Sequence, residues 1–166
     1  MINIRNVKKE DLSKLVAIEN LCFSKEEAAT EKAFEERIRL IPDSFFVAQV
    51  DGEIVGLVNG PVIDAVYITD DLFSHIKENP AIGGHQSILG LAVSPYFQKR
   101  GVATALLSHL EKEAITSKRE TMTLTCKQDL IRFYEKLGYL NCGVSNSNHG
   151  GVTWYNMSKK INHLSF

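Results

Sequence analysis

This sequence has few cysteines, almost no net charge and no long apolar run, and each of these absences excludes a class of protein. The 166 residues include three cysteines, and the formal net charge at pH 7 is −1. A nearly neutral chain lacks the basic surface that holds nucleic acid through its phosphates, so we expect no nucleic-acid partner. No apolar run approaches the ~20 residues of a membrane-spanning helix, so we expect no membrane partner.

Cysteine spacing gives no sign of a metal site. Cys22, Cys126 and Cys142 form no close pair, and their odd number leaves one of them unmatched. We therefore expect no bound metal and a reducing, cytoplasmic setting. The first residues, MINIRNVKKEDL, are charged early and lack the apolar block of a secretory signal, which favours the same location.

The composition suits one ordinary domain over residues 1–166. Hydrophobic residues make up 44% of the chain and charged residues 23%, and a globule of this length buries roughly 70% of its unfolded surface. Asp51-Gly52 predicts a tight hairpin turn, and Ser24 or Thr30 is placed to cap a helix. Periodicity predicts strands at 2–7, 45–50, 53–63, 121–126, 140–144 and 152–157, and helices at 12–21, 34–41 and 129–137.

The stretch from Ser87 to Leu110 predicts an apolar strand, a short turn and an amphipathic helix. Proline cannot continue a strand ladder, so the strand ends at Ser94-Pro95. Apolar residues then recur at three- and four-residue spacing and build one buried helix face. These residues are Val102, Leu106, Leu107, Leu110 and Ala114.

The start of this helix predicts an anion site. The first amide hydrogens of a helix have no partners within it and carry partial positive charge. Gly101 has no side chain to hold a phosphate away, Ala103 intrudes little, and Lys99 and Arg100 add positive charge. The predicted ligand is a diphosphate held by backbone amides. The alternative is a helix that simply begins after a basic turn.

Three segments resemble the GCN5-related N-acetyltransferases. Gln98–Ala103 (QKRGVA) matches the acetyl-CoA loop of that family, Q/R-x-x-G-x-G/A; Leu91–Pro95 (LAVSP) matches the strand end before it, and Phe133–Tyr139 (FYEKLGY) matches a later segment. The resemblance implies a mixed, twisted α/β sheet of about seven strands flanked by about four helices. Gly83–His85 and the context of Phe97 are similar to the arylalkylamine branch of the family.

The resemblance also implies how acetyl-CoA would be held. A backbone amide near Leu91 would polarise the thioester carbonyl, and Val93 would pair with the pantetheine arm. Gly90 predicts a bulge that frees these amides, with tight packing under a helix as the alternative. The implied cofactor contacts are Leu91, Ala92, Val93, Gln98, Lys99, Arg100, Gly101, Val102, Ala103, Thr104 and Phe133.

Tyr134 is the predicted proton donor to the departing thiolate. A phenol has a reference pKa of ~10 and a thiol of ~8.5, so the phenol is protonated at neutral pH. The resemblance places the matching tyrosine beside the cofactor sulfur, whereas the helix pattern alone would favour core packing. Cys126 is an alternative, acyl-accepting nucleophile, but no histidine pairs with it, and we favour a buried small hydrophobe.

The proton acceptor is less well defined. The arylalkylamine branch conducts the proton through two histidines, and the matching positions are Ser87 and Leu89. Leu89 cannot carry a proton, and Ser87 could at most hold a water. His85 lies just upstream with a suitable reference pKa of ~6.5, although a histidine in a glycine-rich loop is more often simply exposed.

The acceptor is predicted to be a small primary amine that attacks acetyl-CoA directly in a ternary complex. The connection 64–84 carries four acidic residues, Tyr67 and Phe73, and would fold over the acceptor site; the alternative is a surface loop. Glu26 and Glu27 could meet a cationic amine, although a solvated face is the favoured interpretation. Other candidate functions are acetylation of a protein N-terminus or lysine, and a non-catalytic acyl-CoA sensor. The oligomeric state stays open between a monomer and a homodimer.

Overall fold

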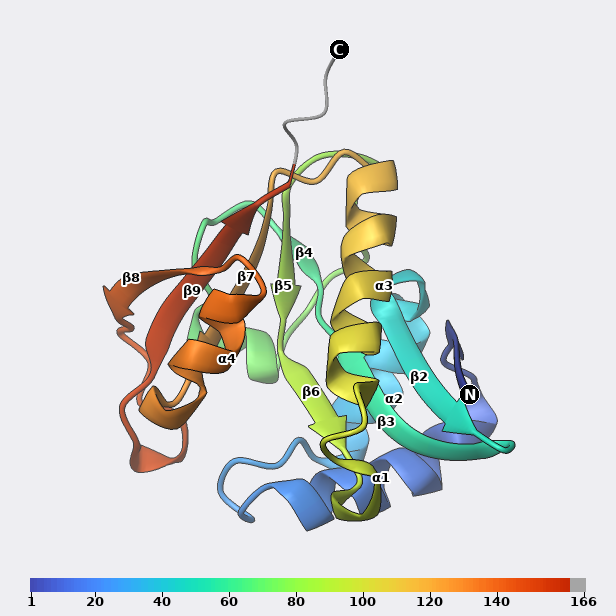
Figure 1. Cartoon of the computed structure of the whole chain (residues 1–166). Helices are drawn as coiled ribbons and strands as arrows, with labels where there is room; N and C mark the ends of the chain where they lie inside the picture. Colours follow the sequence, from blue (N-terminus) through green and yellow to red (C-terminus); the bar gives the residue numbers. More distant parts are fainter. Residues whose placement is uncertain (162–166) are drawn as a thin grey trace.

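Residues 1–161, which the computed structural model describes, form a four-stranded and a five-stranded β-sheet with four α-helices around them (Figure 1). This is the mixed α/β architecture that the sequence predicts, with more strands than the seven expected. The first, antiparallel sheet has the order β1 (Ile2–Asn6), β2 (Phe45–Val50), β3 (Glu53–Asn59), β6 (Gly90–Val93). The second has the order β4 (Val62–Ile63), β5 (His85–Ile88), β7 (Thr121–Cys126), β9 (Tyr155–Lys160), β8 (Leu140–Val144).

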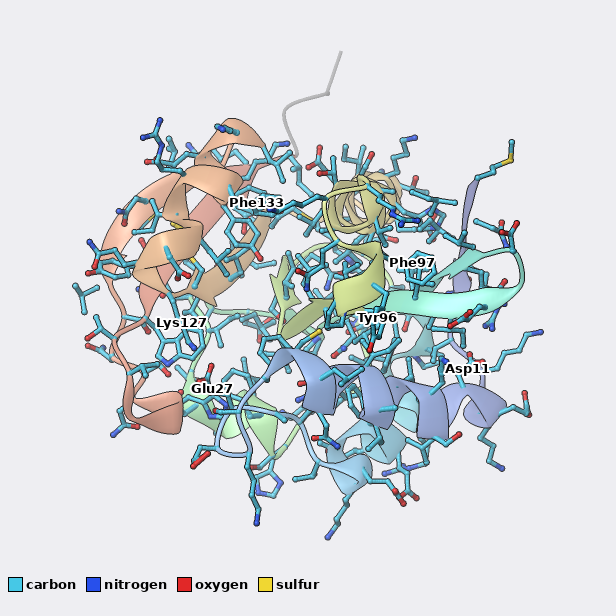
Figure 2. The ribbon with its side chains drawn as sticks, turned by 60° about the horizontal axis from the view of Figure 1, so that its bottom comes forward. Asp11, Glu27, Tyr96, Phe97, Lys127 and Phe133 are labelled. Carbon is cyan, nitrogen blue, oxygen red and sulfur yellow. The ribbon has the colours of Figure 1, made fainter. Side chains whose placement is uncertain are left out.

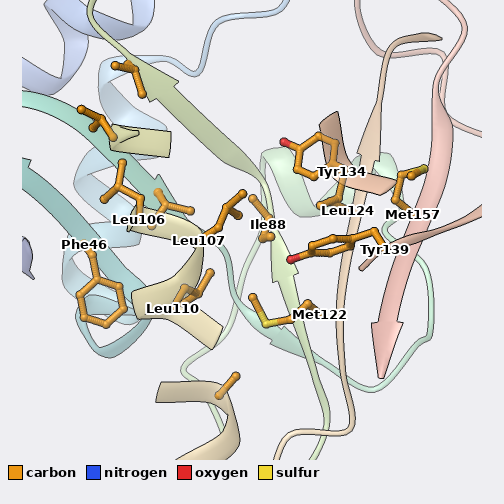
Figure 3. Packing of buried hydrophobic residues seen from close by; sticks show 14 of the residues in the cluster. Phe46, Ile88, Leu106, Leu107, Leu110, Met122, Leu124, Tyr134, Tyr139 and Met157 are labelled. Atoms are coloured by element: carbon orange, nitrogen blue, oxygen red, sulfur yellow. The ribbon is translucent and has the colours of Figure 1, made fainter. Parts of the chain in front are cut away.

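Helices cover both faces of the first sheet. α1 (Leu12–Cys22) and α2 (Glu31–Leu40) lie on one face, and α3 (Val102–Thr116) lies on the other. α4 (Ile131–Lys136) packs against the second sheet. Successive strand residues point to opposite faces. Phe45 accordingly packs with Leu15 of α1 and Phe34 of α2, while Phe46 packs with Leu106 of α3 (Figure 3). None of the helices in residues 1–161 is both long and apolar enough to cross a bilayer.

The central strand breaks at Leu89, and the two sheets part there. β5 and β6 follow one another in the chain, but β5 pairs with β7 in one sheet and β6 with β3 in the other (Figure 1). The Leu89 amide donates to the Asn59 carbonyl (2.8 Å). Gly60 lies against β5 so closely that a Cβ there would overlap the Ser87 carbonyl oxygen. The interruption predicted at Gly90 is confirmed, one residue earlier.

Two predicted strands have different ends, because pairing between distant segments sets them. The strand predicted at 53–63 ends at Asn59, and Val62–Ile63 pairs with β5 in the second sheet. The last strand runs over 155–160 instead of 152–157, since its register with β7 joins Thr121 to Lys160. The helix cap predicted from the local sequence is confirmed at Thr30. Its hydroxyl oxygen accepts a hydrogen bond from the Ala33 amide (3.1 Å) and caps α2.

Candidate active site

A groove runs from the open edge of β6 to the start of α3. It is lined by Leu91, Val93, Phe97, Gln98, Lys99, Gly101, Val102, Ala103, Thr104, Leu130, Phe133 and Tyr134. Most residues predicted to contact acetyl-CoA therefore lie in one groove. Ala92 and Arg100 are the exceptions: Ala92 is buried on the α1 side of the sheet, and the Arg100 guanidinium lies 5.2 Å from the Phe97 ring centre.

The open edge of β6 presents backbone groups to this groove. Ser94 donates its amide to the Val55 carbonyl (2.8 Å). Alternation along the antiparallel pair then turns the backbone groups of Leu91 and Val93 away from β3, toward the open edge. The Val93 carbonyl accepts from Gln98 Nε2 (3.1 Å), so the loop before α3 is tied to the end of the strand.

The start of α3 fits a diphosphate. Gly101 has φ +84°, which favours glycine, and a Cβ there would meet nothing within 4 Å. Lys99 also has a positive φ (63°) and, with Arg100, is exposed at the helix start. The first amides of a 15-residue helix therefore face open space beside two cationic side chains.

An acceptor cavity lies on the other side of β6. It is lined by Glu19, Phe23, Glu27, Phe73, Ile88, Leu89, Gly90, Leu91, Leu124, Thr125, Cys126, Leu130, Tyr134, His149 and Trp154. Leu91, Leu130 and Tyr134 line the groove as well. The groove and the cavity thus meet where the central strand breaks.

Tyr134 stands at this meeting point and is 6% exposed. Its ring is edge-on to Tyr139 (5.5 Å between centres), and its hydroxyl points toward the side of Ile88 and away from Met157 (Figure 3). Burial, reinforced by the nearby Cys126, raises the pKa of Tyr134 well above its usual value. The phenol therefore keeps its proton at neutral pH and can serve only as a donor.

Cys126 lines the cavity as a buried thiol. Burial raises its pKa to about 11, with a smaller contribution from Asp129. The thiolate that a covalent mechanism needs is therefore scarce at neutral pH. This supports the interpretation of Cys126 as a small hydrophobe.

The structure does not bring His85 and Ser87 to the site. Both side chains are buried, and neither lines the groove or the cavity. His85 Nδ1 lies 2.8 Å from Thr121 Oγ1. Thr121 begins β7 and Cys126 ends it, so His85 is roughly 16 Å away from Cys126 along the strand. Ser87 Oγ donates to the Pro61 carbonyl (2.6 Å). The two candidate proton acceptors on β5 are therefore buried and engaged with Thr121 and Pro61, away from the cavity.

Glu19 on α1 is the site residue that sequence reasoning missed. Its side chain lines the cavity but is only 4% exposed. Oε2 accepts from the Ala29 amide (2.8 Å), while Oε1 has no hydrogen-bond partner among residues 1–161. Burial raises the pKa of Glu19, against the opposing effects of the Ala29 bond and the Arg37 charge. The available signal was one carboxylate on the apolar helix face between Leu15 and Cys22.

Four loops meet over the acceptor cavity, and two of them are joined by an ion pair. Glu27, after α1, pairs with Lys127, after β7 (2.8 Å, Figure 2). Burial opposes the shift, but the hydrogen bonds from Lys127 and Ser24 lower the pKa of Glu27. The Glu27 carboxylate is therefore engaged in an ion pair that closes the cavity, and this pairing replaces the predicted solvated face.

Part of the connection 64–84 folds over this cavity, so the segment is not simply a surface loop; that the cavity takes the acceptor stays a prediction. Phe73 stacks on His149 with ring centres 4.4 Å apart and lines the cavity. Asp70 accepts hydrogen bonds from the Ser147 hydroxyl and the Asn148 amide. Tyr67, in contrast, is 40% exposed and does not line the cavity.

The comparisons with known proteins agree with this geometry. The sequence model described as "Acetyltransferase (GNAT) family" matches residues 12–139. An acetyltransferase of Pectobacterium atrosepticum is 35% identical over 113 residues, which are 66% of either chain. An N-alpha-acetyltransferase of Sulfurisphaera tokodaii is 28% identical over 140 residues, 82% of this chain and 78% of that one. The loading GNATL domain of CurA from Lyngbya majuscula has the same fold, with a TM-score of 0.80, 19% identity and coverage of 98% and 99%.

Gly101→Glu should raise the dissociation constant for acetyl-CoA at least about tenfold, because a carboxylate would occupy the space where the diphosphate approaches the amides. Calorimetric titration measures this. Gly52→Glu is the matched control, since Gly52 also has a φ near +80° and open space around it but lies in the β2–β3 turn. Equal affinities of the two variants for acetyl-CoA would show that the diphosphate does not bind at the start of α3.

Proposed function

This chain belongs to the acetyltransferase (GNAT) family, and we propose that it transfers the acetyl group of acetyl-CoA to the primary amine of a small molecule. One observation carries the proposal: the groove and the acceptor cavity lie on opposite sides of β6 and share Leu91, Leu130 and Tyr134. An amine in the cavity could therefore reach a thioester in the groove without a covalent intermediate on the protein.

The groove residues hold and polarise the donor, and acetyl-CoA itself supplies the acetyl group as a thioester. The first amides of α3 bind the diphosphate, with Lys99 and Arg100 beside them. The Leu91 amide, turned to the open edge of β6, donates to the thioester carbonyl oxygen, where negative charge develops. The Val93 amide faces the same edge and pairs with the pantetheine arm.

Glu19 and Tyr134 divide the proton transfers. Glu19 Oε1, which is unpartnered within residues 1–161, accepts a proton from the substrate ammonium and leaves the free amine. Tyr134 gives its phenolic proton to the departing sulfur, which leaves as a thiol, and the second proton lost by the amine nitrogen restores the phenol. Burial makes the Glu19 carboxylate more basic by raising its pKa, and it keeps the Tyr134 phenol protonated until the sulfur departs.

The covered cavity favours a small acceptor. The Glu27–Lys127 pair and the Phe73–His149 stack join four loops in pairs across the acceptor side. A lysine on the surface of a folded protein would have to displace this cover. A protein N-terminus is the second candidate acceptor, because it can enter end-on and because the Sulfurisphaera tokodaii relative is named an N-alpha-acetyltransferase.

Initial rates of thiol release test the proposal on one panel. The panel contains polyamines, arylalkylamines, aminoglycosides, amino acids, and peptides with a free N-terminus. We expect one small amine to exceed every peptide at least tenfold in kcat/KM. If a peptide exceeds every small amine instead, the acceptor is a protein N-terminus and the small-molecule proposal is wrong.

Tyr134→Phe should lower kcat about a hundredfold and leave the affinity for acetyl-CoA nearly unchanged, because only the proton donor is lost. Tyr139→Phe is the control. Tyr139 packs beside Tyr134, its hydroxyl has no hydrogen-bond partner among residues 1–161, and it does not line the cavity. A kcat equally insensitive to both substitutions would exclude Tyr134 from the reaction.

Glu19→Gln should remove the acidic limb of the pH profile of kcat/KM. A base with a raised pKa loses activity as the pH falls through that value, so the wild type should lose rate earlier than an ordinary carboxylate would. We expect the variant to be about a hundredfold slower at neutral pH, with no such limb. Glu10→Gln, an exposed carboxylate just before α1 that lines neither part of the cavity, should stay within threefold. If the acidic limb is unchanged in Glu19→Gln, a group other than Glu19 causes it, and Glu19 is not the base.

A further inference from the structure

Arg37 on α2 is a buried cation that acetyl transfer does not explain. Its side chain is 3% exposed, and Nη1 donates to Asn59 Oδ1 (3.1 Å). Among residues 1–161 no carboxylate forms an ion pair with it. Burial lowers the pKa of Arg37 to about 10, so the guanidinium is still charged at neutral pH. Glu19 and Glu36 act on this charge from more than 4 Å away, so neither forms a direct ion pair with it. A ligand carboxylate could supply the direct partner that a buried charge requires.

Asn59 adds a second unused donor beside the strand break. It is fully buried at the end of β3, opposite Gly90 in the register. Its Nδ2 has no hydrogen-bond partner within residues 1–161, and a Cβ on Gly90 would lie 3.3 Å from it. The Asn59 side chain therefore holds the guanidinium through Oδ1 and still has hydrogens to donate.

Arg37 opens into the outer part of the acceptor cavity. This part shares Glu19, Glu27, Phe73, Leu89 and His149 with the inner part. It also includes Lys25 and Glu26 from the loop after α1, and Lys32, Glu36 and Arg37 from α2, of which only Arg37 is buried. One continuous chamber thus presents the unpartnered oxygen of Glu19 and the unpaired guanidinium of Arg37. Glu27 already pairs with Lys127, so it does not neutralise Arg37.

We propose that Arg37 binds a carboxylate of the acceptor, so that the acceptor is an amino acid or another small amine that carries a carboxylate near its amine. The proposal rests on the acetyltransferase function stated above and narrows its substrate class. The ammonium lies at Glu19, and the carboxylate lies at the guanidinium, whose planar fork of donors matches two carboxylate oxygens. Asn59 is a positioning residue that orients the fork.

Matched pairs of substrates test the charge directly. The twenty amino acids and their carboxamides differ only in the carboxylate, so we expect the wild type to prefer the best acid over its amide at least tenfold in kcat/KM. Arg37→Gln should bring this ratio close to one, mainly through KM. Arg39→Gln, an exposed arginine on the same helix, should leave the ratio unchanged. Equal rates for acid and amide in the wild type would overturn the proposal.

Asn59→Asp keeps the test decisive if Arg37→Gln does not fold. The new carboxylate would sit where Oδ1 now accepts from Arg37, and it would occupy the guanidinium in place of the substrate. We expect the acid preference to disappear while the midpoint of thermal unfolding is kept or raised. A preference that survives in Asn59→Asp would contradict a carboxylate site at Arg37.

Calorimetric binding separates this proposal from the acetyltransferase function. The same acids and amides are titrated into the protein with coenzyme A present, so no turnover is needed. Acid-selective binding with no acetylation of any amine would support the Arg37 site and overturn the proposed activity. Acetylation of amines with equal binding of acid and amide would support the activity and overturn the Arg37 site.

Discussion

The parting of β5 and β6 at Leu89 is the constraint on which the site depends. A continuous strand would have paired β6 on both edges and left no backbone group for a ligand. Because β5 pairs with β7 and β6 with β3, the outer edge of β6 is open, and Leu91 and Val93 turn their amides to it. The first sheet, with β6 at its edge, lies between α1 and α2 on one face and α3 on the other. The open edge of β6 is therefore reached from a cavity on one side and a groove on the other.

Folded proteins otherwise avoid buried polar atoms without partners, and two of those found within residues 1–161 lie at or beside the cavity. They are Glu19 Oε1 and Asn59 Nδ2, and the Arg37 guanidinium next to Asn59 has no direct ion pair among these residues. Thr123, Tyr139 and Asn156 also carry unpartnered atoms, on β7, between α4 and β8, and on β9. Glu19 lines the cavity and Arg37 lines its outer part, so a substrate there could supply the partners that the fold leaves out.

The part of the site that is local in sequence could be predicted, and the part that depends on distant segments could not. The strand end, the loop at Gly101 and the start of α3 follow one another over about fifteen residues, and each has its own signal. His85 was misplaced because its surroundings depend on pairing with Thr121, far along the chain. Glu19 and Arg37 were missed because a charged residue on an apolar helix face gives no sign of what lies opposite. For Arg37 that is Asn59, twenty-two residues away on β3.

Contacts between distant loops close one side of the cavity. Glu27 and Lys127 lie one hundred residues apart in sequence, yet their ion pair joins the two walls beside Trp154. Such a tie limits the access of bulk water, which would otherwise hydrolyse a bound thioester. With that side closed, the outer chamber, which both Arg37 and Glu19 line, is the route we propose for the acceptor. Under this proposal Arg37 selects the acceptor by its carboxylate, and Glu19 prepares its amine for reaction.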